Sequence, residues 1–349
     1  MTTAQAEKFG KRLLVNVVDE RAENEPDREW VSIPRSSDPK DGWKKITYQQ
    51  AANAVNRVAH KLVKSTGVPN QGDFPTVAYI GPSDVRYLVF ALGAVKAGYK
   101  ALFISPRNSQ EGQLNLFEQT NCQVIWFEAT YKNLVQSWVQ ERDMHAFMAF
   151  PVEAWFPEQH IEPYPYNKTF DEAAWDPLLV LHTSGSTGFP KPVVVRHGML
   201  AIADKYHNHG EWNGKRFWLD EMARRSTRML LPSKWQYRWA TVRTQLTGVL
   251  VVPLYHAAAL YLALLMIHYW DLPAAFGVGD RPLSADLALD CLKHAAVDSV
   301  LLPPAILEEL SQGEESVDVL KKLAYVGFGG GEQSFRKGFQ WGFGTRMSC

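Results

Sequence analysis

Strand-like and helix-like segments alternate along the amino-terminal part of the chain. Thr47 is suited to cap a helix over Tyr48–Lys64. Thr76–Ile80 then has the composition of a buried strand, a helical pattern runs on to Lys96, and Gly98–Ile104 is again strand-like. A strand, a helix and a second strand in this order pair in parallel through a right-handed crossover. The sequence therefore predicts an α/β fold with mostly parallel sheets.

Composition and charge narrow the range of functions. The 349 residues include 46% hydrophobic side chains, enough for a sizeable core, and Lys plus Arg and Asp plus Glu both number 37. This balance argues against a nucleic-acid partner or an anionic membrane surface. Cys122, Cys291 and Cys349 are scattered and odd in number, which predicts no disulfide framework. Met1–Arg12 lacks the apolar core of a secretion signal, so we expect a cytoplasmic protein.

One long apolar stretch, Val249–Ile267, reaches the length of a bilayer span. Pro253 and His256 interrupt it, and no basic cluster flanks one side. This pattern favours a buried strand followed by a buried helix, so no membrane span is expected.

A segment rich in hydroxyl groups and glycine lies between two apolar runs, Pro177–Leu181 and Pro192–Val195. Hydroxyl groups donate hydrogen bonds, glycines let backbone N–H groups approach anionic oxygens, and a lysine adds a mobile positive charge. The segment therefore predicts a hairpin loop that binds phosphate groups. Its candidate phosphate-binding residues are Thr183, Ser184, Gly185, Ser186, Thr187, Gly188 and Lys191.

More common interpretations of this loop fit its spacing less well. Gly185 and Gly188 are three residues apart and Pro190 precedes Lys191, which is not the spacing of a Walker loop. The dinucleotide-binding pattern Gly-x-Gly-x-x-Gly is absent as well. An ordinary surface turn remains an alternative, but it has no need of a terminal Pro-Lys pair between two buried strands.

A kinase or hydrolase with an unusual phosphate loop is a further alternative. It would need a metal-binding carboxylate near the loop, and Asp171, Glu172 and Asp176 lie in a segment with the composition of a solvated linker. No set of His, Cys and carboxylate residues has the spacing of zinc ligands. We therefore expect no metal ligands among these residues.

The pattern Thr-Ser-Gly-Ser-Thr-Gly-x-Pro-Lys at 183–191 resembles the nucleotide-binding loop of the adenylate-forming, or AMP-binding, enzymes. This superfamily includes acyl-CoA ligases, adenylation domains of nonribosomal peptide synthetases and fungal carboxylate-reductase-like synthetases. Thr47-Tyr48 and Ala94–Tyr99 are similar to two of its core motifs, and Ser105–Ser109 resembles the fungal reductase-like branch. The resemblance implies the N-terminal large domain of the acyl-CoA synthetase-like fold, with stacked, mostly parallel sheets and an incomplete carboxyl terminus.

The resemblance also implies an activity. Such enzymes use ATP and Mg²⁺ to convert a carboxylic acid to an acyl-adenylate, here in secondary metabolism, for transfer to CoA or to a phosphopantetheine thiol of a carrier domain, or for reduction. Lys191 would compensate the charge of the ATP phosphates. His256, in Pro253–Ala259, would line the acyl pocket, although a histidine in an apolar run is more often a core residue. Gly329, Gly330 and Gly331 would border the adenine and the acyl group.

The resemblance ends after Gly331, and residues 332–349 form a tail without the family pattern. A Tyr-Gly-x-Thr-Glu motif, a mobile carboxy-terminal subdomain with its catalytic lysine, and carrier and reductase domains are not found, so no catalytic residue is predicted. Residues 233–252 interrupt the pattern and are interpreted as an anomalous insertion; both odd segments could be retained intron sequence. We expect residues 1–331 to form an adenylation domain. The alternative is an inactive fragment that binds nucleotide or a partner protein.

Overall fold

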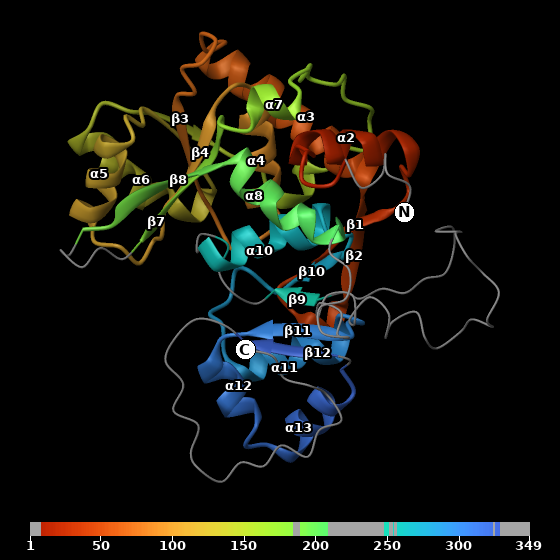
Figure 1. The fold of residues 1–349 in the computed structure, drawn as a ribbon. Coiled ribbons are helices and arrows are strands. Elements are labelled where there is room, and N and C mark those ends of the chain that lie inside the picture. The colour runs from red at the N-terminus through yellow and green to blue at the C-terminus, as the bar shows by residue number, and fades with distance from the viewer. Residues whose placement is uncertain are drawn as a thin grey trace. The chain divides into compact units, whose positions relative to one another are not determined.

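The computed structural model describes residues 8–183, 189–208, 248–250, 254, 257–323 and 325–328. The chain divides into two compact units, and Figure 1 labels their helices and strands. Unit 1 comprises Met1–Trp30, Ile46–Asn208 and Pro253–Tyr269, and unit 2 comprises Val31–Lys45, His209–Val252 and Trp270–Cys349. In the described residues, two six-stranded sheets form the framework.

The sheet of unit 1 has the strand order β6-β5-β3-β4-β7-β8. Neighbouring strands are parallel except for β7 and β8, which are antiparallel. The predicted strand, helix and strand arrangement is confirmed, because β3 and β4 pair in parallel with Val77 opposite Ala101. The strands are β3 (Thr76–Ile80), β4 (Lys100–Phe103), β5 (Val124–Phe127), β6 (His145–Met148), β7 (Pro177–Thr183) and β8 (Lys191–Arg196).

Helices connect these strands, and one of them begins at the predicted cap. Thr47 Oγ1 accepts from the Gln50 N–H at 3.3 Å, and Gln50 Oε1 accepts from the Thr47 N–H at 3.0 Å, which is a capping box. The α-helices of unit 1 are α2 (Leu14–Asn24), α3 (Tyr48–Thr66), α4 (Arg86–Lys96), α5 (Gln110–Gln119), α6 (Lys132–Glu141), α7 (Phe170–Ala173), α8 (His197–Asp204) and α10 (Ala257–His268). Short 3-10 helices are η2 (Ala129–Tyr131), η3 (Val152–Trp155) and η4 (Lys205–Asn208).

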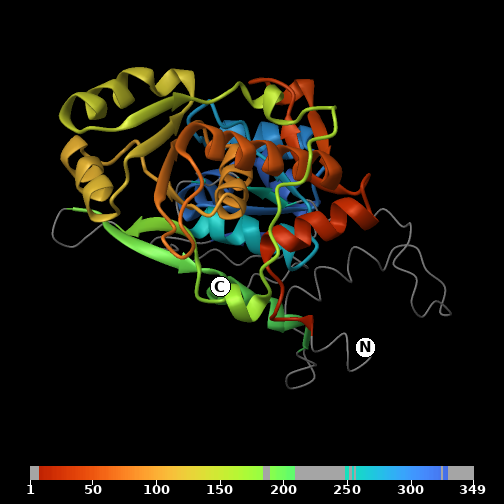
Figure 2. The same cartoon turned by 90° about the horizontal axis from the view of Figure 1, so that it is seen from above.

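Both faces of this sheet are covered by helices. Ala78 of β3 belongs to a buried cluster with Phe117 of α5 and Trp138 of α6, and these two helices lie next to each other (Figures 1 and 2). The next residue of β3, Tyr79, points to the opposite face and stacks on Phe90 of α4 with ring centroids 5.1 Å apart. A parallel sheet buried on both faces has its strand register strongly specified.

Unit 2 contains the second sheet, in the order β12-β11-β9-β10-β1-β2. The pairs β12–β11, β11–β9, β9–β10 and β10–β1 are all parallel. A buried cluster that includes Leu292, Val300 and Leu320 joins the sheet to its helices. The strands are β1 (Glu29–Pro34), β2 (Trp43–Thr47), β9 (Gly248–Leu250), β10 (Ala274–Phe276), β11 (Ser299–Leu302) and β12 (Tyr325–Phe328), and the helices are η1 (Pro39–Asp41), α11 (Ala285–His294), α12 (Pro304–Leu310) and α13 (Glu314–Lys321).

Strand β9 lies inside residues 233–252, the interval interpreted as an insertion. Val249 is opposite Ala275 of β10 on one side and Val300 of β11 on the other. Gly248–Leu250 therefore occupy an interior position of the sheet. For the rest of the interval the interpretation as an insertion stays a prediction.

The apolar stretch Val249–Ile267 contains most of β9 and the greater part of α10, a helix of 12 residues. This is the strand followed by a helix that the interruptions at Pro253 and His256 indicated. In the part of the chain that the structure describes, no helix combines the length and the apolar character needed to cross a membrane.

A buried ion pair joins the amino-terminal segment to the end of α8 in unit 1. Asp204 is 0% exposed and accepts hydrogen bonds from the Gly10 N–H at 2.7 Å and from Arg12 Nε at 3.0 Å. Arg12 also donates to the carbonyl of Tyr269 at 3.3 Å, and Tyr269 Oη donates to the carbonyl of Arg12 at 2.8 Å. One carboxylate thus holds together segments that are far apart in the sequence.

We expect Asp204→Ala to lower the free energy of unfolding by about 3 kcal/mol, because it leaves the Arg12 guanidinium largely buried without its carboxylate. Asp318→Ala is the matched control, since Asp318 is 68% exposed in its ion pair with Lys321 and such pairs contribute about 0–1 kcal/mol. Urea denaturation followed by circular dichroism measures both changes. Equal effects of the two substitutions would contradict the role assigned to Asp204.

Candidate functional site

The predicted phosphate loop lies between the two strands of the β7–β8 hairpin (Figures 1 and 2). The strands pair so that Leu181 is opposite Val193 and Thr183 is opposite Lys191. Thr183 and Lys191 are both exposed, and they flank the loop as directly paired residues. Ser184, Gly185, Ser186, Thr187 and Gly188 lie outside the described residues.

The sheet of unit 1 positions this hairpin. Leu179 of β7 is buried and lies opposite Ala101 of β4, with which β7 runs parallel. The carboxyl ends of β3, β4 and β7 therefore meet at one edge, and Thr183 is the last residue of β7. Open α/β sheets bind ligands outside the carboxyl ends of their strands. The hairpin thus presents a hydroxyl group and an ammonium group at that edge.

A turn that follows β4 packs against the end of β7. The Ser105 backbone N–H donates to His182 Nε2 at 3.1 Å, and Ser105 Oγ accepts from the Arg107 N–H at 3.2 Å. A ring nitrogen that accepts a hydrogen bond carries no proton, so the neutral imidazole has its proton on Nδ1. The Ser105–Ser109 run therefore supports β7, and Arg107 itself is exposed. His182 had no predicted role, and its position directly before Thr183 was the only signal for one.

Helix α5 supports the other side of the loop. Ser109 Oγ caps the helix by accepting from the Gly112 N–H at 3.2 Å. A Cβ atom on Gly112 would lie 3.0 Å from Pro190 Cδ, closer than ordinary packing allows. The glycine therefore lets α5 approach Pro190, the residue directly before Lys191.

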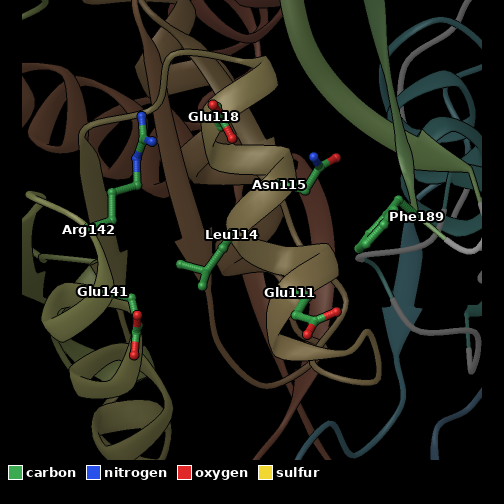
Figure 3. Close-up of a pocket in the computed structure, with 7 residues that line it drawn as sticks. All are labelled: Glu111, Leu114, Asn115, Glu118, Glu141, Arg142 and Phe189. Atoms are coloured by element: carbon green, nitrogen blue, oxygen red, sulfur yellow. The ribbon is translucent and has the colours of Figure 1, made fainter.

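A surface groove of about 390 Å³ lies beside this hairpin (Figure 3). Phe189 forms one wall, and Glu111 and Asn115 lie on the side of α5 that faces it. Leu114, Glu118, Glu141 and Arg142 complete the lining. Three carboxylates against one guanidinium make the groove negatively charged, which disfavours a ligand that carries phosphate. We therefore do not assign the ATP phosphates to this groove.

Other predicted site residues can be located only through their neighbours in the chain. The Leu254 N–H donates to Ser83 Oγ at 2.8 Å, so the Pro253–Ala259 motif passes the turn that follows β3 in unit 1. In unit 2, β12 ends at Phe328. His256, Gly329, Gly330 and Gly331 lie outside the described residues. Their assignment to the acyl and adenine pockets stays a prediction.

Metal-binding and thiol chemistry have little support in the described ranges. No three His, Cys, Asp or Glu side chains there lie close enough together to hold a metal ion. Cys122 and Cys291 are buried free thiols, and burial raises the pKa of Cys122 to about 12. A buried thiol of such high pKa is protonated at neutral pH and does not act as a nucleophile.

A buried histidine without a hydrogen-bond partner lies at the opposite end of the hairpin. His197 begins α8 and is 2% exposed, and neither Nδ1 nor Nε2 has a partner in the structure. Its backbone N–H is held, because it donates to the carbonyl of Asp176 at 3.3 Å. Burial lowers the pKa of His197 to about 4; the Asp176 carboxylate opposes this shift and the Lys168 ammonium adds to it.

This neutral imidazole predicts a pH-dependent stability. The ordinary pKa of histidine is 6.5, so between this value and about 4 the unfolded chain takes up a proton at His197 and the folded chain does not. The stability associated with the neutral ring is therefore complete above about pH 6.5 and is lost as the pH falls through 4. We expect this group to lower the free energy of unfolding by about 2 kcal/mol between about pH 7.5 and about pH 5.

Urea denaturation at the two pH values measures this loss. The His197→Leu chain lacks the titrating group. Its decrease in free energy of unfolding between the two pH values should therefore be smaller by about 2 kcal/mol than that of the unsubstituted chain. His294→Leu replaces an exposed histidine of α11 and should leave the loss unchanged. A His197→Leu chain that keeps the full loss would show that the pH dependence arises elsewhere.

Comparison with known proteins assigns a family to the sequence. The family model described as "AMP-binding enzyme" matches residues 18–334. A carboxylic acid reductase of Neurospora crassa is 57% identical over 332 residues, which cover 95% of this chain and 30% of the reductase. The isocyanide synthase-NRPS hybrid crmA of Aspergillus fumigatus is 29% identical over 335 residues, which cover 93% of this chain and 20% of the hybrid. The chain thus spans less than a third of either relative.

Solved structures share the fold. The N-terminal domain of FACL13 from Mycobacterium tuberculosis matches with a TM-score of 0.66 at 18% identity, over 92% of this chain and 70% of that chain. At this identity the likeness concerns the fold alone. Together with the two mostly parallel sheets, it confirms the α/β class and the N-terminal domain fold that the motifs implied.

Proposed function

The chain belongs to the AMP-binding enzyme family, and from this premise we propose that it activates a carboxylic acid with ATP to form an acyl-adenylate. The observation that carries the proposal is the register of β7 and β8, which pairs Thr183 with Lys191 across the loop of glycines and hydroxyl groups. A hydroxyl donor and a cation on opposite sides of such a loop suit the phosphate groups of a nucleotide.

In the proposed reaction a carboxylate oxygen of the acid attacks the α-phosphorus of ATP. The bond from that phosphorus to the α–β bridging oxygen breaks, and pyrophosphate leaves with the electron pair. Lys191 and the hydroxyl groups of residues 183–187 bind the β- and γ-phosphates, where they stabilise the charge that builds up on the leaving group. The hydrogen bond from Ser105 to His182 holds the strand end that carries Thr183.

Two further parts of the proposed site rest on the family pattern. His256 borders the acyl group, and Gly329–Gly331 border the adenine. Mg²⁺ supplies additional charge neutralisation when it is bound with ATP. Because the described residues contain no cluster of candidate metal ligands, we assign no residue of this chain to the ion.

We also propose a fate for the acyl-adenylate. A thiol, of CoA or of a phosphopantetheine arm on a carrier domain, attacks the acyl carbon, and AMP leaves. Reduction of the resulting thioester is supported by the 57% identity to the Neurospora crassa carboxylic acid reductase. This chain matches 30% of that reductase, and we assign the acceptor and reducing steps to parts of such a protein outside the match. We place the reaction in the cytoplasm.

We expect Lys191→Gln to weaken ATP binding about tenfold or more, since a hydrogen bond to a charged group contributes about 1.5–3 kcal/mol. Isothermal titration calorimetry of the chain with Mg-ATP measures the affinity. Lys132→Gln is the matched control, because Lys132 is an exposed lysine at the start of α6. Unchanged affinity in Lys191→Gln would remove the lysine from the proposed site.

Pyrophosphate exchange tests the chemistry itself. Labelled pyrophosphate should enter ATP only in the presence of a carboxylic acid, because the reverse reaction requires the acyl-adenylate. A panel of aryl, amino, keto and fatty acids identifies the substrate class. Release of inorganic phosphate from ATP without acid would indicate a hydrolase. ATP binding without pyrophosphate exchange for any acid would indicate a fragment that only binds nucleotide. Either result overturns the proposed activity.

A further inference from the structure

Ser83 lies in the turn that follows β3, and its side chain holds a backbone group from a distant part of unit 1. Ser83 Oγ accepts a hydrogen bond from the Leu254 N–H at 2.8 Å. Leu254 is 1% exposed, and a buried N–H group without an acceptor is costly. The serine hydroxyl therefore satisfies the backbone donor of a buried residue.

The turn that carries Ser83 is anchored by its own contacts. Before the serine, Tyr87 Oη donates to the carbonyl of Gly81 at 3.1 Å and accepts from the Gly81 N–H at 3.4 Å. Directly after it, the Asp84 carboxylate accepts from the Arg86 N–H at 3.0 Å and from Arg86 Nη2 at 2.6 Å. Ser83 thus lies between two bonded residues, and its hydroxyl is a fixed point for the segment that it holds.

The segment held by Ser83 leads into α10. Leu254 lies three residues before the first residue of this helix. A different side chain holds the far end, because Tyr48 Oη donates to the carbonyl of Ile267 at 3.0 Å. Loss of the Ser83 hydroxyl would therefore release the entry to α10 and leave the far end of the helix in place.

This contact lies at the same edge of the sheet as the predicted phosphate loop. Strands β3, β4 and β7 are neighbours in this order and run parallel, so their carboxyl ends meet at one edge. Two strand spacings separate β3 from β7, which is about 10 Å. The proposed function binds the phosphates after β7 and places the Pro253–Ala259 motif, which contains Leu254, beside the acyl group. Ser83 thus holds the acid side of the proposed site close to its phosphate side.

We infer that Ser83 is a positioning residue for the acid substrate, a role that rests on the acid activation proposed above. Its hydroxyl acts through Leu254: it fixes the chain that enters α10 at the carboxyl edge of the sheet. The phosphate side does not depend on this contact, because the pairing of β7 with β4 and β8 places Thr183 and Lys191. The affinity for the acid therefore depends on Ser83, and the affinity for ATP does not.

Pyrophosphate exchange with the acid of the panel that gives the highest rate tests this separation. Ser83→Ala should raise the KM for the acid about tenfold, as expected for one lost hydrogen bond to a buried group, and should leave the KM for ATP unchanged. Ser83→Thr keeps the hydroxyl and should retain the low KM for the acid. Ser65→Ala is the matched control, because the Ser65 hydroxyl is exposed and bonds only within the last turns of α3.

Hydrogen exchange followed by mass spectrometry tests the contact without any substrate. In Ser83→Ala the peptide that contains Leu254 should exchange about tenfold faster, whereas the peptide of β7 should exchange as in the unsubstituted chain. If Ser83→Ala does not fold, Ser83→Cys replaces it, because a thiol is only a weak acceptor.

The outcomes separate this inference from the proposed function. An unsubstituted chain without exchange for any acid overturns the proposed function and the role of Ser83 with it. An active chain in which Ser83→Ala keeps the normal KM for the acid overturns the role of Ser83 alone. An equal rise in the KM for ATP, or unchanged hydrogen exchange at Leu254, also refutes the positioning role.

Discussion

Leu179 lies opposite Ala101 of β4 on one side and Val195 of β8 on the other, and this double pairing ties the hairpin to the core of unit 1. A slip of one residue would turn the buried side chains of β7 to the opposite face of the sheet. Because helices cover both faces, such a slip is strongly disfavoured. The same register sets Thr183 against Lys191. Apolar packing within the sheet therefore decides where a hydroxyl group and an ammonium group flank the phosphate loop.

The two ends of this hairpin differ in their exposure to solvent, and their chemistry differs for that reason. At the tip Lys191 is exposed, so its ammonium group can meet an anionic ligand without first losing much hydration. At the base His197 is buried, and the cost of placing a charge there keeps its ring neutral. The tip thus suits a charged substrate, and the base keeps a histidine ring uncharged.

Elements with strong local patterns could be predicted, and elements held by their neighbours could not. The strand Thr76–Ile80 has the predicted bounds, and α3 begins after its predicted cap at Thr47. Residues 170–173 looked like solvated linker, but α7 forms there because Thr169 and Glu172 make a capping box. Strand β9 has three residues and lay in an interval interpreted as an insertion. The apolar run that begins at Val249 indicated a buried strand, but only the pairing with β10 and β11 places that strand inside the sheet.

The family and the phosphate-binding candidates follow from local chemistry, because the spacing of hydroxyl groups, glycines and Lys191 is a property of one short segment. The supports of that segment are contacts between residues distant in the sequence. Ser105 meets His182, and Gly112 meets Pro190, because the strand order places β4 beside β7. The isolation of the His197 ring is likewise visible only in the folded chain. Sequence spacing carries no information on such contacts, since they depend on which strands become neighbours and which side chains lose contact with water.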